Sequence, residues 1–237
     1  MDRKVWTAIG IMIFLAVLLC AAQGYRRELW LSLKGMEQAL NHTKQGTKET
    51  IVLDPGHGGF DPGKVGVSNT LEKDINLAIA KLVKIELETS GYTVYMTRED
   101  DRALCEGKES SKKMADMKNR VAFIEKTSPR VAISIHQNSF SAGTKGAQVF
   151  YYSSSEDGKK LAAYIQSSIR DAVGDNNHRV EKANDSYYML KNVKCPLVIV
   201  ECGFLSNPSE EILLKEESYQ KKMAHGICEG LENFLYK

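Results

Sequence analysis

The chain has 237 residues, of which 43% are hydrophobic and 26% are charged. This is the composition of an ordinary globular protein that is long enough to bury a sizeable core. The formal net charge is only +2, and no long block of lysine and arginine occurs. Both features argue against a nucleic acid as the partner.

The N-terminus carries an apolar segment, because residues 5–22 contain no charged side chain. Their number lies at the lower edge of what a helix needs to span a bilayer. We therefore expect residues 1–22 to form an uncleaved membrane anchor. A cleavable signal peptide is the alternative, since Cys20, Ala21 and Ala22 offer the small residues that cleavage requires. In both cases the rest of the chain is exported.

A tether is expected at residues 23–48. Its first part has apolar residues at helical spacing, typical of a short amphipathic helix beside the membrane: Leu29, Trp30, Leu33, Met36 and Leu40. The polar stretch that follows has no apolar period and resembles a flexible linker.

From residue 51 onward, strands alternate with helices. Strands are predicted at residues 51–54, 92–98, 130–136, 146–152 and 195–203, and helices at 69–91, 112–126, 156–173 and 218–237. The buried stripe of the first helix is expected on Leu71, Ile75, Ala78, Leu82 and Ile85. This alternation predicts a single α/β domain, residues 49–237, with a largely parallel central sheet.

The loop after the first strand imitates a nucleotide-binding P-loop. Gly58, Gly63 and Lys64 have the spacing of G-x-x-x-x-G-K. However, Val65 replaces the Ser or Thr that would hold magnesium, and Pro62 removes a backbone N–H that a phosphate cradle needs. We therefore expect no nucleotide here.

The cysteines give no metal or disulfide framework. One of the five lies in the apolar segment, and the others are scattered without a C-x-x-C: Cys105, Cys195, Cys202 and Cys228. We expect Cys202 and Cys228 to be small buried residues. A disulfide between Cys195 and Cys202 remains open.

Three polar side chains stand at the ends of predicted strands. His57 follows the first strand, His136 ends "VAISIH", and Glu201 ends "VIVE". The carboxyl ends of parallel strands meet at one edge of the sheet, where ligands bind. Glu72 begins the helix after the glycine-rich loop.

Two histidines and a carboxylate from separate elements suit a catalytic zinc, which also needs an unliganded carboxylate as general base. We assign His57, Glu72 and His136 to one Zn²⁺ ion and Glu201 to the base. Glycines beside His57 let the loop bend toward the metal.

Each of these residues also has a simpler structural explanation. Glu72 lies three residues after Asn69, the spacing of a helix capping box. His57 suits a polar turn, and His136 suits a buried histidine with satisfied hydrogen bonds. Glu201 is harder to explain in this way, because a carboxylate directly after "LVIV" must be paired, protonated or placed in a cleft.

Five ordered motifs from residue 51 to residue 237 resemble the zinc-dependent N-acetylmuramoyl-L-alanine amidases of the type-3 amidase family. They are "LDPGHGG", "LEKDINL", "SIHQNS", "GAQVFYY" and "VIVECGFLSNPSE". The family's zinc ligands fall on His57, Glu72 and His136, and its catalytic glutamate falls on Glu201. The resemblance implies a six-stranded sheet flanked by helices. It also implies hydrolysis of the amide between the lactyl group of N-acetylmuramic acid and L-alanine of the peptidoglycan stem peptide.

An apolar anchor followed by one amidase domain resembles the germination-specific amidases of endospore formers. That resemblance implies action on spore cortex during sporulation, from the forespore envelope, so that muramic-δ-lactam forms and germination proceeds. It also makes a lipoprotein a candidate partner. Two alternatives remain open, a zinc peptidase acting on stem peptides and a partner-dependent wall-binding module with little activity alone.

Overall fold

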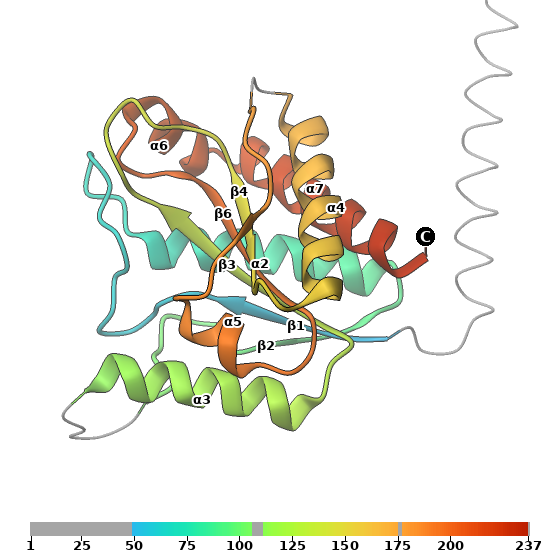
Figure 1. Cartoon of the computed structure of the whole chain (residues 1–237). Coiled ribbons are helices and arrows are strands. Elements are labelled where there is room, and N and C mark those ends of the chain that lie inside the picture. Colours follow the sequence, from blue (N-terminus) through green and yellow to red (C-terminus); the bar gives the residue numbers. More distant parts are fainter. Residues whose placement is uncertain (1–48, 106–110, 175–176, 237) are drawn as a thin grey trace, which may run out of the picture. The chain divides into compact units, whose positions relative to one another are not determined.

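The computed structural model describes residues 49–105, 111–174 and 177–236. Within them, six strands form one sheet in the order β2-β1-β3-β6-β4-β5 (Figure 1). The strands are β1 (Thr50–Pro55), β2 (Thr93–Met96), β3 (Val131–Asn138), β4 (Gln148–Tyr151), β5 (Lys182–Ala183) and β6 (Leu197–Phe204). Strands β2, β1, β3 and β6 run parallel, whereas β4 is antiparallel to β6. The predicted α/β fold with a largely parallel sheet is confirmed.

Helices cover both faces of this sheet. The first face carries α2 (Glu72–Thr89), α4 (Glu156–Val173) and α7 (Glu217–Tyr236), which share one apolar core. The second face carries α3 (Lys112–Thr127) and α5 (Tyr188–Asn192), which share a smaller core. The short α6 (Pro208–Lys215) follows β6. The described helices include none that is long and apolar enough to cross a membrane, and the anchor and tether predicted in residues 1–48 lie outside the described residues.

Residues of the central strands alternate between the two cores. Ile133 and Ile135 of β3 belong to the larger core. Ala132, the neighbour of Ile133 along the strand, belongs to the smaller core. Burial on both faces explains why these strands read as continuous apolar runs. The same period of two places His136 on the side of Ala132 and Glu201 on the side of Ile199. Both side chains therefore face the layer formed by α3 and α5.

The buried stripe predicted for α2 is partly wrong. Ile75 is buried as expected, but Ile85 is 61% exposed. The buried apolar positions further along are instead Ile79, Ala80, Val83 and Leu87. Because α2 packs against both the sheet and α7, its buried arc is centred away from the predicted stripe.

The sequence patterns missed three short elements, β5, α5 and α6, which are too short to show a hydrophobic period. Only α6 had a local signal, since Asn207 caps it by accepting from the N–H groups of Ser209 and Glu210, and Pro208 occupies the first turn.

The four cysteines in the described residues are free, so the disulfide left open between Cys195 and Cys202 is not formed. Cys202 and Cys228 are buried, as expected.

Candidate active site

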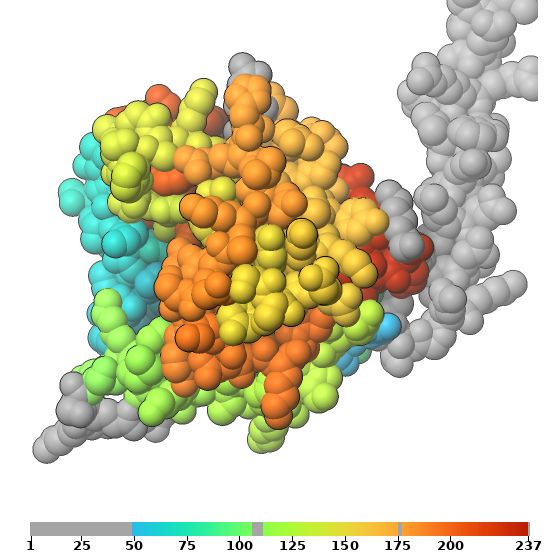
Figure 2. Space-filling view, in the orientation of Figure 1, coloured from blue at the N-terminus to red at the C-terminus, as the bar shows by residue number. Residues whose placement is uncertain are grey.

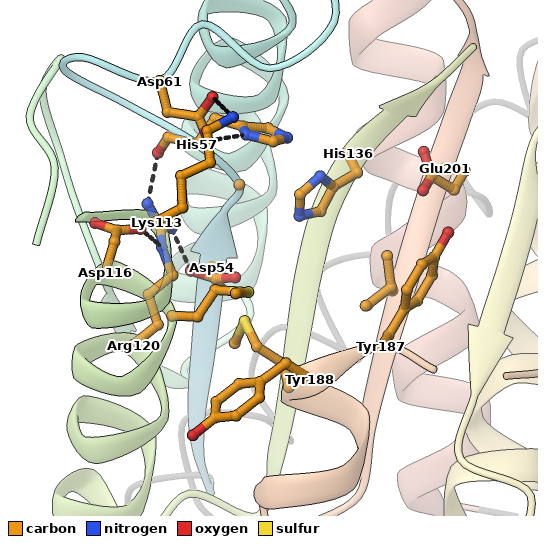
Figure 3. Close-up of a pocket in the computed structure, with 14 residues that line it drawn as sticks. Asp54, His57, Asp61, Lys113, Asp116, Arg120, His136, Tyr187, Tyr188 and Glu201 are labelled. Carbon is orange, nitrogen blue, oxygen red and sulfur yellow. Dashed lines mark hydrogen bonds and ion pairs between the residues drawn. The ribbon is translucent and has the colours of Figure 1, made fainter. Parts of the chain in front are cut away.

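The three residues predicted to bind zinc lie together at the carboxyl edge of the sheet, and Figure 3 shows two of them, His57 and His136. His57 follows β1, Glu72 is the first residue of α2, and His136 lies on β3. One donor atom from each side chain lies within 4.8 Å of the other two. Oε1 of Glu72 is 3.2 Å from Nε2 of His57 and 2.9 Å from Nδ1 of His136. The structure thus brings residues 57, 72 and 136 into one cluster.

Glu201 lies beside this cluster, because its Cα pairs with that of His136 across β3 and β6. The side chain is 7% exposed, and its Oε2 has no hydrogen-bond partner among the described residues. Burial raises the pKa of Glu201 to about 7, although the nearby charge of His136 opposes the shift. A carboxyl with a pKa near neutrality is suited to take and release a proton.

The interpretation of Glu72 as a helix cap is wrong. The cap position of α2 is Leu71, which makes no side-chain cap hydrogen bond. The carboxylate of Glu72 instead accepts from the backbone N–H of Lys64 at 2.7 Å and of Gln137 at 3.0 Å. Burial alone would raise the pKa of Glu72, but its hydrogen bonds and charge interactions with His136 and His57 hold that pKa well below its usual value. The carboxylate is therefore ionised, as a metal ligand must be.

The loop around His57 needs glycine at two positions, because other side chains approach the backbone closely there and because one position has a positive φ. A Cβ on Gly56 would lie 2.1 Å from the His136 ring. A Cβ on Gly63, whose φ is +70°, would lie 2.5 Å from Oε2 of Glu72. His57 itself has a φ of 62°, a conformation that costs free energy in a residue with a side chain. The loop must therefore be held by contacts elsewhere.

Two buried arginines hold the backbone of this loop. Arg120 of α3 donates to the carbonyl oxygens of Pro55 at 2.9 Å and His57 at 2.6 Å. Arg98 donates to those of Pro55 and Gly56, both at 2.9 Å. Sequence reasoning missed both residues. Arg98 had a usable signal, because it ends a predicted strand as His136 does, whereas Arg120 lies within a helix and had none.

Asp54, at the end of β1, is fully buried and neutralises Arg120. Its carboxylate accepts from the hydroxyls of Thr97 and Ser134, each at 2.7 Å, and from Nη1 of Arg120 at 2.7 Å. Burial alone would raise the pKa of Asp54, but Arg120 and the two hydroxyls lower it to about 2. The ion pair is therefore complete and satisfied at neutral pH.

Asp61 orients the ring of His57. Its Oδ2 lies 2.9 Å from Nδ1 of His57, and its Oδ1 lies 2.9 Å from Nζ of Lys113. An imidazole that donates one N–H to a carboxylate presents its other nitrogen to a metal. Two histidines and an ionised carboxylate, with this support, form a donor set that fits Zn²⁺.

A cavity of about 320 Å³ adjoins the cluster. His57, His136 and Glu201 line one side of it, and residues of α3 and α5 line the other. Figure 2 shows the segment between α4 and β6 (orange) lying across this face of the molecule, beside the green of α3. The lining of the cavity combines charged groups with Met117, Met189 and Ile199, which is the mixture typical of ligand-binding pockets.

Comparisons with known proteins agree on one family. The family model described as N-acetylmuramoyl-L-alanine amidase matches residues 51–233. The germination-specific N-acetylmuramoyl-L-alanine amidase of Bacillus subtilis (strain 168) is 42% identical over 189 residues, which are 78% of this chain and 79% of that protein. The amidase LytC of the same organism is 31% identical over 78% of this chain but only 35% of its own length.

Solved structures share the fold. The CwlD amidase from Clostridioides difficile, in complex with the GerS lipoprotein, superposes with a TM-score of 0.77 at 40% identity and covers 79% of this chain and 98% of that one. An N-acetylmuramoyl-L-alanine amidase from Clostridium difficile 630 gives a TM-score of 0.71 at 32% identity, covering 80% and 98%.

Protonation of Asp54 at acid pH should lower the free energy of unfolding. Because its folded pKa of about 2 lies below the ordinary value of 3.8, its contribution to stability is present above 3.8 and is lost as the pH falls toward 2. Asp54→Asn should lower the free energy of unfolding at neutral pH by about 3 kcal/mol, since it breaks a buried pair. It should also flatten the acid dependence. Urea unfolding at several pH values measures both, with the exposed Glu229→Gln as control, and an unchanged acid slope would refute the assignment.

Removing the carboxylate beside His57 should weaken zinc binding. Asp61→Asn no longer fixes the imidazole in its ligating orientation, and we expect the affinity to fall about 10- to 100-fold. Competition with a chelating dye measures this affinity. Asp101→Asn is the control, because Asp101 also binds this loop, at the N–H of Gly59, but contacts no histidine. Equal zinc affinities of Asp61→Asn and the natural chain would contradict the role of Asp61.

Proposed function

The chain belongs to the N-acetylmuramoyl-L-alanine amidase family, and we propose that it removes stem peptides from spore-cortex peptidoglycan with one zinc ion and Glu201 as general base. The protein is an enzyme that acts on peptidoglycan. The proposed zinc ligands are His57, Glu72 and His136. The observation that carries these roles is the cluster of three donor atoms within 4.8 Å, next to a buried carboxylate with an unpartnered oxygen.

Each residue has a defined task in this reaction. When bound, zinc supplies a Lewis acid that polarises a carbonyl and lowers the pKa of water. Glu201 takes the proton of the attacking water and delivers a proton to the departing nitrogen of L-alanine. Its pKa, raised to about 7 by burial, suits both transfers. Asp61 keeps His57 in one orientation, and the N–H groups of Lys64 and Gln137 fix the carboxylate of Glu72.

The cortex is the proposed substrate because of the family branch that the chain resembles. The relative with 42% identity is named as germination-specific and spans a comparable length. Removal of stem peptides leaves muramic acid free for later conversion to muramic-δ-lactam, the mark that germination enzymes recognise. The amidase relatives support a location in the envelope, where peptidoglycan lies. We place the enzyme on the forespore side that faces the cortex, tethered by residues 1–22 and 23–48 ahead of a catalytic domain at 49–237.

A lipoprotein is the proposed partner. The CwlD amidase, which shares this fold at 40% identity, was solved in complex with the GerS lipoprotein. A partner of that kind would also explain control without a built-in lid, because no long insertion resembling an autoinhibitory helix separates residues 136 and 201 in the sequence.

The proposed roles predict different defects for two variants. Glu201→Gln should keep about one zinc per chain but lower kcat about a thousandfold, because it removes the base and leaves the ligands. His57→Ala should lose both zinc and turnover. Elemental analysis gives the zinc content, and release of peptides with free N-terminal L-alanine from intact glycan gives the activity, with Glu229→Gln as control. Activity of Glu201→Gln near that of the natural chain would rule out Glu201 as the base, and cleavage within the stem peptide would indicate a peptidase.

Spores test the cortex assignment separately. Spores that produce Glu201→Gln in place of the natural chain should contain cortex without muramic-δ-lactam and should fail to complete germination. Mass spectrometry of cortex fragments measures the lactam. An unchanged lactam content would remove the cortex role and leave the amidase activity untouched.

A further inference from the structure

Tyr187 lies against the proposed base. It directly precedes α5, and its side chain lines the same cavity as Glu201. Figure 3 shows its hydroxyl end pointing toward the carboxylate of Glu201. The phenol and the carboxylate lie close enough for each to shift the pKa of the other. The reaction described above gives this tyrosine no task.

The position of Tyr187 is set by contacts that do not involve Glu201. Its backbone N–H donates to Oδ1 of Asn184 at 3.2 Å, and the N–H of Asn184 donates to the carbonyl of Tyr151 on β4 at 2.8 Å. The ring packs edge-on against Phe150, with centroids 5.7 Å apart and planes at 69°. The hydroxyl is therefore directed at the carboxylate by the sheet and its buried core, and its position is fixed before any substrate binds.

The side chains beside Glu201 in the sheet have their polar groups bound to other partners. His136 on one side is bound to Glu72. Gln148 on the other side has its amide oxygen bound to Arg179 at 3.0 Å and its amide nitrogen bound to the carbonyl of Val180 at 3.0 Å. A buried carboxylate that lacks a fixed donor can rotate between orientations, and its ionised form is costly. Tyr187 lines the same cavity, and its hydroxyl is a donor that such a carboxylate needs.

We propose that Tyr187 is a positioning residue of the amidase, whose hydroxyl donates to Glu201 and fixes the rotation of that carboxylate so that its unpartnered oxygen faces the attacking water. This inference rests on the proposed function, with Glu201 as the base. The water's proton passes to Glu201 and a proton then passes to the leaving nitrogen. Tyr187 keeps its own proton throughout. Burial and the charge of Glu201 raise the pKa of Tyr187 to about 12, so the phenol remains a donor at neutral pH.

Tyr187→Phe tests this by removing only the hydroxyl and keeping the ring against Phe150. We expect kcat to fall about tenfold, the usual effect of losing a hydrogen bond to a charged group. KM, zinc content and melting temperature should stay unchanged, because the ring packing and the metal ligands are intact. Tyr95→Phe is the control, since Tyr95 is 49% exposed on the outer strand β2 and contacts no part of the cavity.

A second variant separates positioning from a merely structural role. Glu201→Asp shortens the side chain and withdraws the carboxylate from the hydroxyl of Tyr187. In that background, Tyr187→Phe should lower kcat less than about twofold, because the interaction is already lost. Equal losses in both backgrounds, or an unchanged kcat in Tyr187→Phe alone, would overturn the inference. If Glu201→Gln is inactive while Tyr187→Phe is fully active, only this inference fails. If Glu201→Gln stays active, the proposed base fails with it.

Discussion

The buried ion pair between Asp54 and Arg120 is the interaction on which the site depends. Arg120 reaches from α3 to the carbonyls of Pro55 and His57, and this fixes a histidine whose backbone is in the left-handed region. Asp54 neutralises that arginine and also binds Ser134, two residues before His136 on the next strand. This one buried pair therefore links the loop that carries His57 to the strand that carries His136, and so fixes the two histidines relative to each other.

The two glutamates at this edge of the sheet, Glu72 and Glu201, have opposite pKa shifts. Glu72 is surrounded by N–H donors and imidazoles, and its pKa falls well below the usual value although burial opposes this. Glu201 is equally enclosed but has few donors, and burial raises its pKa to about 7. Two glutamates at one edge are thus suited by their surroundings to the two proposed roles, an anionic metal ligand for Glu72 and a proton acceptor for Glu201. The period of two along β3 and β6 directs His136 and Glu201 into the same cavity.

The sequence was enough to predict the alternation of strands and helices, the parallel sheet and the candidate residues at strand ends, because these follow from local periodicity and one rule of topology. The sequence was not enough to predict the side chains that hold the site residues in position. Asp61 stands in the motif but shows its task only once His57 is placed, and Arg120 binds residues more than sixty positions away. Tyr187 was missed because α5 is five residues long and its contact with Glu201 is purely tertiary. The alternative interpretation of Glu72 as a helix cap failed for a similar reason, since a capping-box spacing is common and only tertiary contacts reveal where the carboxylate points.

X-ray absorption at the zinc edge of the metal-loaded enzyme tests the proposed centre most directly. We expect a spectrum with two imidazole nitrogens and one carboxylate oxygen, each at about 2.0–2.2 Å from the metal, and the same spectrum for Glu201→Gln. A sulfur ligand, a single imidazole, or a change of ligand set in Glu201→Gln would contradict the division of these four residues into three ligands and one base.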